Sequence, residues 1–432
     1  MSNSFPSLSR SIRLALTAIA ATIAIGATGA PAVAQSLANR VASASGHSVQ
    51  FTFASRPGVC GDGRTYISTG PGNFYGYSIN TNSEQCQAGP ARVVVDLADK
   101  NVVALRTYVG APTTDAGVTN LGNVTPADAA DYLLGVAARA DGRVGRDAIF
   151  AALLADSVDV SSRLLEIGRD QARPLETRRA ALSGLARNAP AQLDRIGSAL
   201  VQVATNEGDV QAVRTSALSV LSRLDHGAGI QPLIQLASSN LTSWVGRESM
   251  SVLARSGDPR ARQFIRSTAQ RTDLPDEVLA VALRGLGREY VTGQDAQLLR
   301  SLYPRLTGQR SRDAVLASLS ELGGVDNVQW LTGLVRDEKL PPDARRRALQ
   351  YLTRAGATAG SLVALYDATT DVQLREALIS SYSRLSEKTA TDKLIWIARN
   401  EQNATLRRRA VSALARNNDP VVRQAMQDIV ER

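Results

Sequence analysis

A short block bounded by arginines returns repeatedly through most of this sequence. It reads Arg-Ala-Ala-Leu-Ser-Gly-Leu-Ala-Arg at 179–187 and Arg-Arg-Ala-Val-Ser-Ala-Leu-Ala-Arg at 408–416. Alignment on the central apolar residue gives nine anchors: Ile149, Leu182, Leu218, Met250, Leu283, Leu316, Leu349, Leu378 and Val411. Successive anchors lie 29 to 36 residues apart, and five of the eight spacings are 33. Internal repetition at this period predicts an array of small helical units rather than one globular core.

Each unit contains a second helical segment between anchors, as at 193–204, 230–237, 328–335 and 394–398. Turn residues separate the two segments, and Asp276, Asp343 and Asp371 stand where the anchor helix needs an N-cap. A single helix pair cannot bury its apolar stripe, so neighbouring pairs must stack. We therefore expect about nine helix pairs from residue 126, where Thr125-Pro126 is a helix-start signal, plus a terminal helix near residue 432.

The repeated block resembles HEAT repeats, in particular the short bacterial kind of the phycobilisome-lyase group. The resemblance rests on an acidic or asparagine cap, an arginine and an apolar stripe, as in Asp371-Val-Gln-Leu-Arg-Glu-Ala-Leu378. It implies a mainly α fold, a right-handed α-α superhelix, over 126–432. The whole layout also resembles exported bacterial HEAT-repeat proteins.

Arginines recur near the anchors and form a ladder of one per unit. Six lie three residues before their anchor and Arg214 lies four before, and the ladder breaks at Ala280 and Asp313. Its members are Arg146, Arg179, Arg214, Arg247, Arg346, Arg375 and Arg408. Such a ladder could line a groove for an anionic partner. The resemblance implies a structural role instead, in which each arginine pairs with an acidic or carbonyl group of an adjacent repeat.

The first 34 residues have the features of a signal peptide. Arg10 and Arg13 precede an apolar stretch over 14–25, and Ala32-Val33-Ala34 is a small-x-small cleavage site. We therefore expect export to the periplasm with cleavage near Ala34. The alternative is a retained anchor, which would place the chain at a membrane. Glycines and a proline interrupt the apolar run before it reaches the roughly 20 residues that a membrane-spanning helix needs.

Residues 35–111 predict a small β-rich module, followed by a linker over 112–125. Segments 48–54, 92–97 and 102–109 have the alternation or β-branched residues of strands, and the last two form a predicted hairpin. Cys60 and Cys86 are the chain's two cysteines, and in an exported protein they predict a disulfide. Two cysteines without neighbouring histidines are too few for a zinc site, so no metal is expected.

The glycine-rich stretch after Cys60 lacks the Gly-Lys-Ser/Thr ending of a phosphate-binding loop. Phe74, Tyr75 and Tyr77 follow it. These aromatic residues either form a recognition loop or pack inward in ordinary turns.

The charge distribution and the absence of catalytic motifs narrow the classes of function that we expect. The net charge is +9 and 45 of the 49 basic residues are arginine, but 40 acidic residues are interspersed with them, which does not favour nucleic acid as a partner. No classical catalytic motif occurs, and no cofactor is expected. Repeat arrays usually bind, so we expect a non-catalytic scaffold or adaptor for a protein or peptide. An enzyme with a non-classical site, for which HEAT-type lyases are a precedent, is the alternative, and an anionic polymer is a weaker one. The oligomeric state is not indicated.

Overall fold

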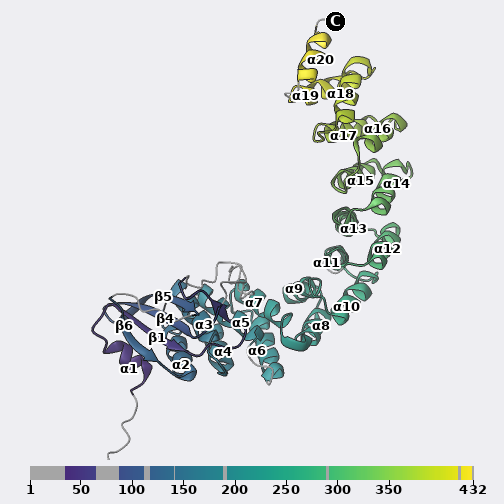
Figure 1. Cartoon of the computed structure of the whole chain (residues 1–432). Coiled ribbons are helices and arrows are strands. Elements are labelled where there is room, and N and C mark those ends of the chain that lie inside the picture. Colours follow the sequence, from purple (N-terminus) through teal and green to yellow (C-terminus); the bar gives the residue numbers. More distant parts are fainter. Residues whose placement is uncertain are drawn as a thin grey trace, which may run out of the picture.

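The protein is mainly helical, with a small sheet at the N-terminal end of a long helical stack (Figure 1). The computed structural model describes residues 35–64, 87–110, 117–140, 142–187, 192–288, 291–416 and 420–430. The predicted signal peptide, the predicted linker residues 112–116, Cys86 and the aromatic residues Phe74, Tyr75 and Tyr77 lie outside the described residues. The predictions that concern them therefore stay predictions.

The main sheet has four strands in the order β5-β4-β1-β6. Its strands are β1 (Ser48–Phe53), β4 (Ala91–Ala98), β5 (Asn101–Val109) and β6 (Thr119–Asn123). β4 and β5 form the predicted antiparallel hairpin, which turns at Asp99 and Lys100 with φ values of 48° and 64°. Two short strands, β2 (Cys60–Gly61) and β3 (Gln87–Ala88), form a second sheet, and a short helix α1 (Leu37–Ala42) precedes β1.

The predicted linker is wrong for its second half. β6 pairs in parallel with β1, with Val49 opposite Thr119, so residues 119–123 form an edge strand of the module. The sequence Thr-Asn-Leu-Gly-Asn does not predict a strand because it has no run of β-branched residues. It also contains Gly122, which adopts a φ of 75° and is unfavourable within a strand.

The sheet module packs directly against the first helices of the stack. Phe51 is fully buried, and its ring meets the edge of Tyr132 with centroids 5.8 Å apart. The Arg56 amide donates to the Leu154 carbonyl at 2.9 Å, and the Asp156 amide donates to the Ala54 carbonyl at 3.1 Å. The two regions share one hydrophobic core, so the module covers the N-terminal end of the stack.

The helices of the stack form two rows, which we call the inner and outer rows. The inner row holds the predicted anchors and consists of α3 (Gly142–Leu153), α5 (Leu175–Gly184), α7 (Gln211–Leu221), α9 (Trp244–Leu253), α11 (Asp276–Leu286), α13 (Gln309–Leu322), α15 (Pro342–Arg354), α17 (Val372–Tyr382) and α19 (Ala404–Leu414). The outer row consists of α2 (Pro126–Ala137), α4 (Ser161–Arg169), α6 (Leu193–Thr205), α8 (Ile230–Ser239), α10 (Pro259–Ala269), α12 (Gly293–Leu302), α14 (Val325–Arg336), α16 (Ala359–Ala368), α18 (Lys388–Asn400) and α20 (Pro420–Val430).

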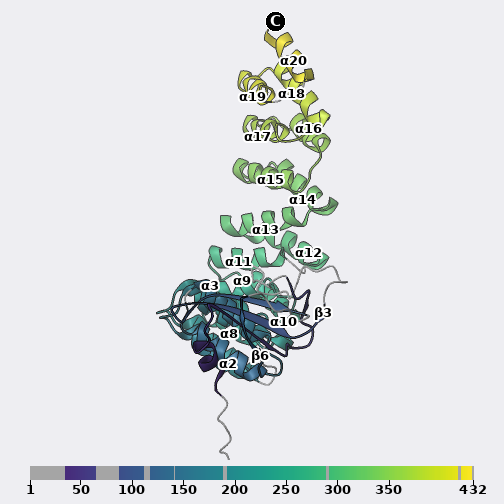
Figure 2. The same ribbon diagram turned by 60° about the vertical axis from the view of Figure 1, so that its left-hand side comes forward.

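The inner helices contact one another in sequence order from α3 to α19, and each packs on a neighbouring outer helix. From α9 onward the inner row lies on the concave side of an arc, and a second view separates the same two rows (Figures 1 and 2). Every anchor from Ile149 to Leu378 is at most 1% exposed, whereas Val411 in the last inner helix is partly buried. The residues that recur in the sequence are therefore the ones that each inner helix buries in the core.

Helix starts agree with the sequence in part. Thr125 caps α2 ahead of Pro126, and Asp371 caps α17, as predicted. Asp276 instead lies inside the first turn of α11, and its carboxylate accepts the amides of Arg310 (2.8 Å) and Ser311 (2.9 Å). It thus caps the inner helix of the following unit, a use that spacing within one unit does not reveal.

Candidate functional site

Arginines of the inner helices bind the ends of the outer helices. The Nε groups of Arg178, Arg214 and Arg345 donate to the carbonyl oxygens of the residues ten positions earlier, at 3.1, 3.0 and 2.9 Å. These acceptors lie in the last turns of α4, α6 and α14, where helical carbonyls lack intrahelical donors. A guanidinium there satisfies such a carbonyl and interacts favourably with the helix dipole.

A second group of arginines binds carbonyls that lie just beyond the ends of outer helices. Arg312, Arg375 and Arg407 donate to the carbonyls of the residues six positions earlier, at 2.8, 2.7 and 2.7 Å. We call these six residues the capping arginines: Arg178, Arg214, Arg312, Arg345, Arg375 and Arg407. Their shared contact joins each inner helix to the last turn of the preceding outer helix or to the turn that follows it.

Three capping arginines also reach an acid of the next unit. Arg178 binds both carboxylate oxygens of Asp209, and the two side chains are each 4% exposed. Arg345 lies 3.8 Å from Asp371, and Arg375 lies 3.5 Å from Glu401. The Arg178 hydrogen bond is the main reason that the pKa of Asp209 lies below its usual value. These pairs join neighbouring units of the array.

The predicted ladder therefore contains two kinds of arginine. Arg214 and Arg375 are capping arginines, whereas the equivalent residue in three other units lies one position before the ladder member, at Arg178, Arg345 and Arg407. One residue along a helix is a rotation of about 100°. That step moves the side chain from the outer-helix contact to the inner surface. In these three units the arginine that binds the end of the outer helix is therefore one residue earlier than the ladder predicts.

The remaining ladder residues make other contacts. Arg146 lies 3.7 Å from Asp147, and Arg179 donates to Ser216 Oγ of the next unit at 3.3 Å. Arg247 lies 3.9 Å from Glu277, and Arg408 is exposed. Arg346 binds Gln373 and Asp343.

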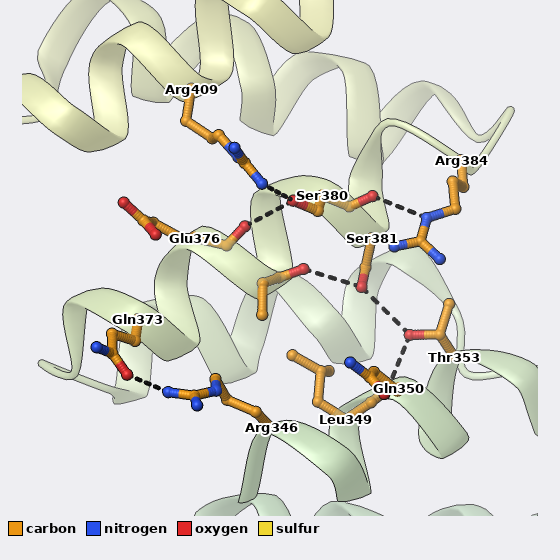
Figure 3. A pocket seen from close by; sticks show the side chains of 11 residues that line it. Arg346, Leu349, Gln350, Thr353, Gln373, Glu376, Ser380, Ser381, Arg384 and Arg409 are labelled. Atoms are coloured by element: carbon orange, nitrogen blue, oxygen red, sulfur yellow. Dashed lines mark hydrogen bonds between the residues drawn. The ribbon is translucent and has the colours of Figure 1, made fainter. Parts of the chain in front are cut away.

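A hollow of about 450 Å³ opens among α15, α17 and α19, and we call it the C-terminal hollow (Figure 3). It is lined by Arg346, Leu349, Gln350, Thr353, Gln373, Glu376, Ala377, Ser380, Ser381, Arg384 and Arg409. The lining contains three arginines and one carboxylate, that of Glu376, and serine, threonine and glutamine side chains supply most of the rest. The hollow is therefore polar and carries a net positive charge.

Hydrogen bonds hold the lining in place. Arg409 donates to Ser380 Oγ at 3.3 Å, and Arg384 Nε donates to the Ser380 carbonyl at 3.2 Å (Figure 3). Thr353 donates to Ser381 Oγ at 3.3 Å, across the boundary between α15 and α17. A guanidinium carries five N–H donors, so these contacts leave Arg384 and Arg409 with donors for a ligand.

A second hollow, of about 480 Å³, lies on the same row and is called the central hollow. It is lined by Arg247, Glu277, Val281, Arg284, Arg310, Asp313, Ala314, Ala317 and Tyr351. Arg310 lies 3.1 Å from Glu277, and Arg347 lies 3.1 Å from Asp313, so its charges are largely paired within the lining or beside it. Among the lining residues alone, the C-terminal hollow has three arginines and one carboxylate, and the central hollow has three arginines and two carboxylates.

Arg346 is the one lining residue that sequence reasoning singles out as a site residue, and Arg384, Arg409 and Gln350 are among those it missed. Arg409 follows Arg408 directly, and Arg384 lies just beyond the end of α17, outside the repeated block. Only the stacking of three units brings them together in one lining.

Other functional features are sparse in the described part of the chain. No group of three or more His, Cys, Asp or Glu side chains there is arranged to hold a metal ion. No helix among the described residues combines the length and apolar character needed to cross a membrane.

No protein-family model matches the sequence, and no curated protein matches it. Among solved structures, human deoxyhypusine hydroxylase in complex with glycerol is similar to 55% of this chain and 96% of its own chain. The sequence identity is 18% and the TM-score is 0.26, values too low to support an argument about function.

Proposed function

We propose that this chain is a non-catalytic scaffold, a HEAT-type α-solenoid that binds a protein partner along its inner row. The partner presents an extended, carboxylate-bearing segment to the C-terminal hollow. The proposal includes the periplasmic location expected from residues 1–34, where such a partner would be an exported protein or peptide.

The observation that carries the proposal is the division of the arginines into two sets. The capping arginines are engaged with helix ends and neighbouring units. Arg346, Arg384 and Arg409 instead line one open, polar hollow. Their bonds to Asp343, Gln373 and Ser380 use only some of their N–H donors. Arginine binds carboxylates through paired N–H donors, and the nearby hydroxyl and amide groups suit a peptide backbone. An open hollow that spans three units fits a segment of a larger partner better than an enclosed small molecule.

The test begins with photocrosslinking in cells to identify the partner, which is then purified for calorimetry. A triple variant with Arg346, Arg384 and Arg409 replaced by Ala is expected to weaken binding by about tenfold or more, because charged hydrogen bonds contribute about 1.5–3 kcal/mol each. Raised salt should weaken the wild-type complex as well.

The matched control replaces three exposed arginines away from the hollow, Arg163, Arg195 and Arg271, by Ala. It changes the net charge by the same amount and should leave affinity within about twofold. Equal loss in both triple variants would show that only net charge matters. Full binding by the hollow variant would exclude this site. Turnover of a small molecule that both variants retain would favour the enzyme alternative.

A further inference from the structure

A separate hollow of about 680 Å³ lies where the sheet module meets the first helix pair. Its walls come from α1, the β4–β5 turn, α2 and the start of α3. It is lined by Ala38, Asn39, Val41, Ala42, Leu97, Lys100, Asn101, Val102, Val103, Tyr132, Val136, Arg139, Ala140 and Val144. We call it the module hollow. Its size is in the range of small-molecule sites, about 300–1,000 Å³.

The lining combines an apolar surface with two cations. Val103 is 53% exposed on one wall, and Val41 and Val136 are buried on others. Lys100 and Arg139 are exposed, and among the described residues neither side chain forms an ion pair or hydrogen bond. The described lining contains no Asp or Glu. An apolar tail and an anionic headgroup would each find a complementary surface here.

Tyr132 adds an independent observation. Tyr132 is one of the lining residues and is 7% exposed, and its hydroxyl oxygen is buried without a hydrogen-bond partner among the described residues. A buried hydroxyl without a partner is unfavourable and calls for an explanation. Burial raises the pKa of Tyr132 to about 12, against the opposing effect of Arg139, so the hydroxyl stays protonated as a donor.

We infer that the module hollow binds an amphiphilic anion, a molecule with one hydrocarbon chain and one anionic headgroup. The hydrocarbon chain of the ligand packs on the valines of α1, β5 and α2. Lys100 and Arg139 hold the headgroup. The Tyr132 hydroxyl is buried, so it donates to the headgroup only after a small shift of the lining that the ligand induces. The bound ligand would also cover the exposed side chain of Val103.

The binding test uses the full chain as its host processes it. A fluorescent polyene fatty acid, cis-parinarate, is titrated below its micelle concentration. We expect saturable one-to-one binding, displacement by dodecanoate and no displacement by dodecyltrimethylammonium. Equal displacement by the cationic amphiphile would overturn the inference, and so would no binding at all.

Variants assign the binding to these residues. Lys100→Ala and Arg139→Ala should each lower affinity by about tenfold. The control Arg143→Ala removes an arginine that is 69% exposed on α3 and should have no effect. Parinarate binding that survives in the Lys100→Ala, Arg139→Ala double variant would place the ligand elsewhere and overturn the inference.

Tyr132→Phe separates ligand binding from folding. Removing a hydroxyl that lacks a protein partner should leave the Tm of the ligand-free chain unchanged or raised, while the affinity for parinarate falls. A lower Tm in the ligand-free variant, or unchanged affinity, would contradict the role given to Tyr132.

The ligand could come from a free fatty acid or from a membrane lipid, which share this chemistry. Vesicles of phosphatidylglycerol, with phosphatidylcholine vesicles as a control, distinguish the two. Extraction of lipid from the anionic vesicles that depends on Lys100 and Arg139 points to a membrane source. Binding of monomeric parinarate alone points to a free acid.

Discussion

Arg178 and Asp209 form a two-point ion pair between consecutive units, with each side chain 4% exposed. The same guanidinium donates through Nε to the Gly168 carbonyl at 3.1 Å. One side chain thus joins the end of α4, the inner helix α5 and the loop that leads into α7. Arginine is suited to this position because its planar group supports several directed hydrogen bonds at once.

Loss of Asp209 should destabilise the stack strongly. Asp209→Ala leaves the Arg178 charge buried without its acid, which typically costs about 3–5 kcal/mol. The measurement is urea denaturation followed by circular dichroism. The control Asp131→Ala removes an acid that is 79% exposed and 3.6 Å from Arg163, and should change stability by about 0.5 kcal/mol or less. Similar effects for the two variants would contradict the structural role of the buried pair.

Acid should destabilise the protein through Asp295. Burial works to raise the pKa of this carboxyl, but hydrogen bonds from Arg266 (2.6 Å) and Arg262 (2.8 Å) outweigh it and hold the pKa well below 3.8. The unfolded chain therefore binds a proton at higher pH than the folded chain. The resulting stability is present above about pH 4 and is lost as the pH falls below it.

The measurement is the Tm between pH 7 and pH 2.5, for wild type and Asp295→Asn. The variant should be less stable at pH 7 and should lose less stability on acidification, because it lacks the titrating group. Parallel pH profiles would show that Asp295 does not contribute.

The sheet module should stabilise the array. Phe51→Ala removes a fully buried ring that contacts Tyr132, and such substitutions cost about 3–5 kcal/mol. Hydrogen exchange should increase in α2 and α3 as well as in the sheet, because they share a core. Exchange that rises in the sheet alone would mean that the module folds independently. Point variants are preferable to deletion of the module, which would expose the core of α2 and α3.

Export, which residues 1–34 predict, should leave the two cysteines oxidised. The β2–β3 pairing places Cys60 opposite Ala88, which follows Cys86 by two residues in the sequence. We expect no alkylation without reductant. Replacement of both cysteines by Ser should destabilise the chain by about 3 kcal/mol in the chain-entropy model. Free alkylation of the folded protein would contradict both the bond and the exported location.

The sequence predicts the stack well because its signal is periodic and local. Buried anchors such as Leu182 and Leu283 recur at nearly constant spacing, and Thr125 and Asp371 are caps that operate within a few residues. Features that depend on neighbours in space are harder to predict. β6 is held by pairing with β1, and Asp276 caps a helix about 34 residues further on.

The candidate site is predictable only in part. The ladder includes Arg346, which lines the C-terminal hollow, but not Arg384 or Arg409, whose convergence depends on the angles between three units. The choice between Arg178 and Arg179 depends on a rotation of one residue, and only the position of the α4 carbonyl decides it. The module hollow is formed from segments about 100 residues apart in the sequence, so no local pattern indicates it.

The most direct test of the inner row as a binding surface is site-specific photocrosslinking in the native host. A photoreactive residue at Gln350, exposed within the C-terminal hollow, is compared with one at Gln297, exposed on the outer helix α12. We predict one protein crosslink at Gln350 that disappears with Arg346, Arg384 and Arg409 replaced by Ala, and none at Gln297. Crosslinks of equal yield at both positions, or at Gln297 alone, would contradict the proposal that the concave surface binds the partner.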